Sequence, residues 1–66
     1  MKSGTVLENG FIVIATTNIT VLAERNGLYG VFKREDTGIN IEPLTITNSK
    51  NEILDNFISL SLNKIH

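Results

Sequence analysis

The chain has 66 residues, which is enough for one small domain. It contains no cysteine and one histidine, His66, so disulfides and thiolate metal sites are excluded, and we expect neither a metal nor another cofactor. Six basic and seven acidic residues give a formal net charge of -1, which predicts no general attraction to nucleic acid or to a membrane surface.

Size and apolar content also bear on assembly and location. A domain this short buries only about 60% of the surface that its unfolded chain exposes, so a second copy is a common source of further stability. Since 41% of the residues are hydrophobic, we expect a homo-oligomer. The apolar run Phe11–Ala15 is too short for a signal peptide or a membrane span, which favours a cytoplasmic protein.

The first predicted element is a β-hairpin over residues 5–15. Its turn is Asn9-Gly10, because both residue types tolerate the positive φ of a type I′ turn and the pair lies between β-rich segments. A two-residue loop places alternate side chains on the two sides of the ribbon: Thr5, Leu7, Ile12 and Ile14 on one, and Val6, Glu8, Phe11 and Val13 on the other. Both sides are apolar enough to need cover.

A second hairpin is predicted over residues 19–34, with its turn at Asn26-Gly27. The expected core side carries two facing pairs of this register: Val21 and Phe32, Ala23 and Gly30. The opposite side holds Leu22 and Val31 in its middle. Because one helix covers only one face of a sheet, we expect the other face to be covered by closure into a barrel or by a second subunit.

A turn over residues 35–38 and an edge strand over 39–47 are predicted next. The alternation of apolar and polar residues in this strand is interrupted by Pro43. Proline cannot donate to a β ladder, so the strand lies at an edge of the sheet or bends there.

The C-terminal segment, residues 49–65, is predicted to form a helix. Ser49 and Glu52 have the spacing of a capping box, and apolar residues then recur at helical spacing: Ile53, Leu54, Phe57, Ile58, Leu62 and Ile65. The alternative is a further strand over residues 58–62, where polar and apolar residues alternate strictly.

Together these elements predict a mainly β fold of the α+β class: an antiparallel meander of four to five strands, forming a small barrel or half-barrel, with a C-terminal helix. The segments Asn18–Leu22, Asn26-Gly27 and Val31–Lys33 resemble the middle strands of Sm-like RNA chaperones of the Hfq type. The resemblance covers about a quarter of the chain and implies a small bent sheet. The residues after Lys33 depart from the histidine-containing, RNA-contacting turn of that family.

Motifs that would carry catalysis are weak in this sequence. Asp36-Thr37-Gly38 matches the tripeptide of aspartic proteases, but it follows Lys33-Arg34-Glu35 instead of an apolar strand, which favours a polar turn. His66 is terminal, where a general base is poorly positioned. We therefore predict that the protein is not an enzyme and has no catalytic residues.

The second hairpin carries a cluster of basic and aromatic residues. We predict a ligand- or partner-binding site there, formed by Arg25, Tyr29, Lys33 and Arg34 together with Leu22 and Val31 of the outer face.

The predicted function is that of a small non-enzymatic binding protein that acts as a homo-oligomer. Its partners would be a second copy and either a host protein or a small anionic ligand, without a membrane. The small size suggests an accessory protein of a phage or mobile element, such as an inhibitor or a ligand sponge. The alternative is a small nucleic-acid-binding β-barrel, because cations hold phosphates and aromatic rings stack on bases.

Overall fold

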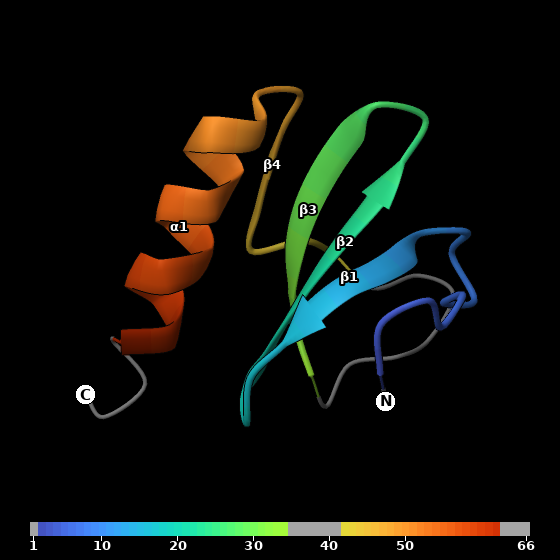
Figure 1. Cartoon of the computed structure of the whole chain (residues 1–66), viewed down its shortest axis with the longest axis horizontal. Coiled ribbons are helices and arrows are strands. Elements are labelled where there is room, and N and C mark those ends of the chain that lie inside the picture. The colour runs from blue at the N-terminus through green and yellow to red at the C-terminus, as the bar shows by residue number, and fades with distance from the viewer. Residues whose placement is uncertain (1, 35–41, 63–66) are drawn as a thin grey trace.

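The computed structural model describes residues 2–34 and 42–62. In chain order, its elements are β1 (Ile12–Thr16), β2 (Thr20–Arg25), β3 (Leu28–Lys33), β4 (Thr45–Thr47) and α1 (Lys50–Leu62). The strands form one open antiparallel sheet in the order β1-β2-β3-β4, and α1 lies against one face of it (Figure 1). The predicted α+β class, with an antiparallel meander and a C-terminal helix, is confirmed, and the sheet is open instead of closed into a barrel.

The register of β2 and β3 agrees with the predicted one. Val21 pairs with Phe32 and Ala23 pairs with Gly30. Asn26 and Gly27 have φ values of 52° and 83°, so both adopt the left-handed conformation that a two-residue type I′ turn requires.

The first hairpin differs from its predicted register by one residue. Leu7 N–H donates to the carbonyl of Phe11 at 2.7 Å, and Gly10 N–H donates to the carbonyl of Leu7 at 2.9 Å, so the loop has three residues instead of two. Asn9 Oδ1 accepts from Phe11 N–H, and Gly10 has a φ of 91°, which is the usual chemistry of a three-residue hairpin loop. Because side chains alternate, the shift turns Leu7 inward.

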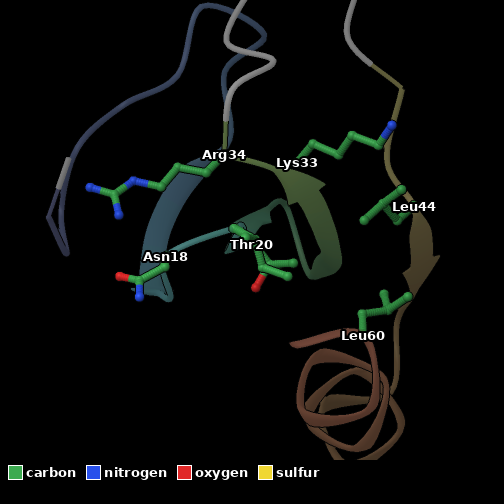
Figure 2. Close-up of a pocket in the computed structure, with 7 residues that line it drawn as sticks. Asn18, Thr20, Lys33, Arg34, Leu44 and Leu60 are labelled. Carbon is green, nitrogen blue, oxygen red and sulfur yellow. The ribbon is translucent and has the colours of Figure 1, made fainter. Parts of the chain in front are cut away.

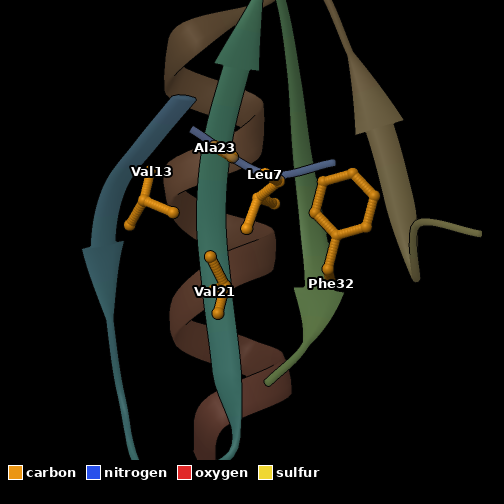
Figure 3. Close-up of a cluster of buried hydrophobic side chains, with 5 residues drawn as sticks. All are labelled: Leu7, Val13, Val21, Ala23 and Phe32. Carbon is orange, nitrogen blue, oxygen red and sulfur yellow. The ribbon is translucent and has the colours of Figure 1, made fainter. Parts of the chain in front are cut away.

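This shift allows the N-terminal segment to cover a face of the sheet. Leu7 packs against side chains from three strands, and the cluster consists of Leu7, Val13, Val21, Ala23 and Phe32 (Figure 3). Phe11 lies at its edge, with its ring 5.1 Å from the ring of Phe32 in a T-shaped arrangement. Part of the exposed surface that we expected a second subunit to shield is thus covered by the chain itself.

Helix α1 covers the other face. Ile53 is fully buried against Leu22 and Val31, and Phe57 and Leu60 pack around them. The helix therefore packs on β2, β3 and β4. The segment Ile58–Leu62 lies within α1, so the helix is correct and the alternative strand is wrong.

The start of α1 is fixed by side chains of β4 and the loop after it. Ser49 Oγ accepts from Glu52 N–H at 3.4 Å, as a capping box requires. The Glu52 carboxylate turns instead to Thr47, whose hydroxyl donates to it at 3.0 Å. Farther along the helix, Asn56 donates to Thr45 at 3.3 Å, so this flank of α1 faces β4.

Several predictions made from the sequence lie outside the described residues. These are the turn over residues 35–38 with its Asp36-Thr37-Gly38 motif, the first part of the 39–47 strand, and the helix beyond Leu62. The described part of that strand, β4, begins after Pro43.

Candidate functional site

A hollow in the described part of the molecule, which we call the large hollow, lies at the end of the sheet opposite the Asn26-Gly27 turn. Its volume is about 450 Å³, which is within the range of small-molecule sites. Four segments contribute to its lining: the start of β2, the end of β3, the residue before β4 and the second half of α1. The lining residues are Asn18, Ile19, Thr20, Lys33, Arg34, Leu44 and Leu60 (Figure 2).

Thr20, which lines the hollow, belongs to a chain of hydroxyl groups. Thr20 Oγ1 lies 2.6 Å from Thr17 Oγ1 and 2.9 Å from Ser61 Oγ, and Ser61 donates to the carbonyl of Phe57 at 2.7 Å. Because the Ser61 proton is directed to that carbonyl, Thr20 donates to Ser61 and Thr17 donates to Thr20. The Thr20 hydroxyl thus has a fixed direction, and it ties β2 to α1.

The polar side chain of Thr20 is buried, with 2% of its surface exposed. A buried hydroxyl without partners would destabilise the fold, whereas this one both donates and accepts. The network therefore holds the helix at a fixed distance from the sheet beside the hollow.

Two cations, Lys33 and Arg34, come from adjoining positions and point to different sides of the hollow (Figure 2). Lys33 is exposed, and its side chain extends toward Leu44. Arg34 is half-buried and extends toward Asn18, and its Nη1 donates to the carbonyl of Thr17 at 3.1 Å. Arg34 thus supports the loop before β2, while the ammonium of Lys33 lies beside the apolar wall.

The apolar wall consists of Leu44 and Leu60. A second, more open hollow of about 230 Å³ shares both leucines and continues along the groove between β4 and α1, where Thr45, Asn56 and Ser59 line it. The groove therefore becomes more polar with distance from the two leucines.

The structure does not bring all the predicted site residues together. Arg25 lies at the other end of the hairpin, where its Nη1 donates to the carbonyl of Asn9 at 2.9 Å and links the two turns. Tyr29 is half-buried against the cluster beneath α1. Of the four predicted polar and aromatic residues, Lys33 and Arg34 alone line the large hollow.

Leu22 and Val31 were predicted to form an exposed apolar face for a partner. They are 2% and 0% exposed, because α1 lies over them. A partner therefore cannot reach either side chain in this fold, and the physical reason is that the C-terminal helix covers this face instead of the one that holds Phe32.

Five lining residues were missed in the sequence: Asn18, Ile19, Thr20, Leu44 and Leu60. The signal for Leu44 was its place directly after Pro43, at the bend of an edge strand. The other four acquire their roles from the docking of α1 on β2, which the sequence pattern does not specify.

No family model, curated protein or solved structure matches this chain. Within residues 2–34 and 42–62, no group of three or more histidine, cysteine or acidic side chains is placed to hold a metal ion. In the same residues, no helix has both the length and the apolar character needed to cross a membrane.

Proposed function

We propose that this chain is a small non-enzymatic binding protein that holds a small ligand in the large hollow between β2, β3, Leu44 and Leu60. The observation that carries the proposal is the meeting of Lys33 and Arg34 with two leucines around about 450 Å³ of open space. Small-molecule sites combine an apolar lining with a few placed polar groups in this way.

The chemistry of the lining supports binding more than catalysis. The hydroxyl of Thr20 is engaged as donor and acceptor, so it is not poised as a nucleophile. Arg34 is held by the carbonyl of Thr17. Of the described side chains around the hollow, none is a carboxylate or an imidazole that would serve as a general base.

Self-association is the second part of the proposal, and its support comes from apolar residues on β1 and α1. Val13 points into the cluster around Leu7, so Ile12, its neighbour on the strand, points to the face on which α1 lies. Helix α1 packs on β2, β3 and β4, and its Asn56 flank faces β4. The opposite flank carries Leu54 and Ile58, which therefore face toward β1.

These side chains are well exposed for aliphatic residues. Ile12 is 49% exposed, Ile58 is 57% exposed and Leu54 is 39% exposed. A second copy that covered them would remove this apolar surface from water. We call Ile12, Leu54 and Ile58 the β1–α1 face.

Nucleic-acid binding has less support. Base stacking needs an open aromatic face, whereas Phe32 is 1% exposed and Tyr29 is half-buried. The cations at Arg25 and Lys33 lie at opposite ends of the hairpin. A role as a phage or mobile-element inhibitor or ligand sponge, and a cytoplasmic location, stay predictions from the sequence.

Native mass spectrometry of protein taken directly from cells, with sedimentation velocity over a concentration series, tests both parts. We expect a homo-oligomer that carries a bound small molecule, released on denaturation. A ligand-free monomer at every concentration, which also fails to bind any member of a fragment library, would contradict the proposal.

A further inference from the structure

We infer that the large hollow takes a small anionic amphiphile, meaning one carboxylate or phosphate group on a short aliphatic chain. The inference rests on the proposed function and specifies its ligand class. It is carried by the positions of Lys33, Leu44 and Leu60 around one space.

Lys33 provides the contact for the anionic group. Its aliphatic stem runs along the rim of the hollow toward Leu44, so the ammonium lies where the apolar wall meets solvent (Figure 2). An ammonium donates up to three hydrogen bonds and favours a negative partner, and charge-assisted bonds of this kind are stronger than neutral ones. Arg34 adds positive charge on the far side, although one of its donors is committed to Thr17.

The aliphatic part of the ligand would lie against the leucines. Leu44 is 43% exposed and Leu60 is half-buried, so both present aliphatic surface to the hollow. A volume of about 450 Å³ corresponds to roughly fifteen water molecules at about 30 Å³ each, which leaves room for an octyl chain with its head group. The smaller hollow shares both leucines, and its other lining residues, Thr45, Asn56 and Ser59, are polar.

The test is an amide-shift titration by NMR with octanoate, octyl phosphate, octanol and octylamine, using wild-type protein, Lys33→Gln and Lys50→Gln. Lys50 is the matched control, because it is an exposed lysine at the other end of α1 and its substitution changes the net charge equally. Thermal unfolding of each variant verifies that it is folded.

We expect one or both anionic probes to shift the amides of Thr20, Lys33, Leu44 and Leu60 in a saturable way, with octanol at least about tenfold weaker. Lys33→Gln should lower the affinity for the anionic probes by about tenfold and leave the affinity for octanol unchanged. Lys50→Gln should alter neither affinity. The comparison of the affinities for octanoate and octyl phosphate identifies the preferred head group.

Two outcomes would overturn the inference, and they differ in what else they overturn. If octanol or octylamine binds as tightly as the anionic probes, the ligand class is wrong although the hollow is a binding site. If none of the four probes shifts these amides, the inference is wrong, and a fragment library that also leaves them unshifted would remove the proposed function as well.

Discussion

The hydroxyls of Thr20 and Ser61 lie 2.9 Å apart and join the first residue of β2 to the last turn of α1. The two residues are 41 positions apart in the chain, so this bond reports directly on how the helix docks. It also places Leu60, the neighbour of Ser61, at the wall of the large hollow.

Removing the Thr20 hydroxyl should weaken the attachment of the C-terminal end of α1 to the sheet. Thr20→Val keeps the side-chain shape and leaves the Thr17 proton and a Ser61 lone pair without partners, so we expect a loss of about 1–2 kcal/mol in the free energy of unfolding. Urea denaturation measures it. Thr16→Val is the control, because the Thr16 hydroxyl takes no part in this chain of bonds. Equal stability of the two variants would mean that the network does not hold α1.

The N-terminal segment should be required to cover its face of the sheet. Leu7 is 7% exposed whereas its neighbour Val6 is 65% exposed. Leu7→Ala should cost about 2 kcal/mol or more and increase binding of a hydrophobic dye, since it uncovers the cluster around Phe32. Val6→Ala should change neither quantity measurably. If Val6→Ala lowered the free energy of unfolding more than Leu7→Ala in urea denaturation, the two-residue loop and its register would be supported.

Gly30 should tolerate no side chain. A Cβ at this position would lie 3.0 Å from one ring carbon of Phe32 and 3.6 Å from Phe11, and Phe32 is itself fully buried. The ring cannot move freely, so Gly30→Ala should destabilise the protein by about 1–3 kcal/mol despite the better strand propensity of alanine. Urea denaturation at matched protein concentration measures whether the substitution lowers or raises the free energy of unfolding. Unchanged or higher stability would show that the two aromatic rings are not packed as described.

Self-association should depend on the β1–α1 face. Ile58→Lys places a charge on this face at a site that is already 57% exposed, so we expect weaker association and little change in unfolding of the monomer. Ile46→Lys introduces the same charge at an isoleucine of β4 that is 48% exposed and points away from α1, outside this face. Sedimentation velocity compares the two variants. If both associate as the wild-type protein does, the interface lies elsewhere.

The sequence predicts the second hairpin and the helix well because local chemistry determines them. Asn26-Gly27 allows positive φ at both residues, and this alone sets the pairing of Val21 with Phe32. Ser49 and Glu52 mark the start of α1. The first hairpin has an equally strong Asn-Gly signal, but a three-residue loop competes there and brings Leu7 into the core.

The candidate site is less predictable. Lys33 and Arg34 stand out as cations on a β-rich hairpin, and both line the hollow. Leu60 and Thr20 belong to it because α1 covers Leu22 and Val31, and the choice of face depends on tertiary packing. Arg25 is a cation on the same hairpin as Lys33, yet it donates a hydrogen bond to the Asn9 carbonyl at the far end of the sheet.

The most direct test of the central claim, that the large hollow is where this protein binds its ligand, is a backbone amide-shift map recorded with a library of small fragments. We predict that the fragments that bind shift the amides of Asn18, Thr20, Lys33 and Leu60 together, while those around the Asn26-Gly27 turn stay in place. Shifts centred on the turn and Tyr29, with the hollow unaffected, would contradict it.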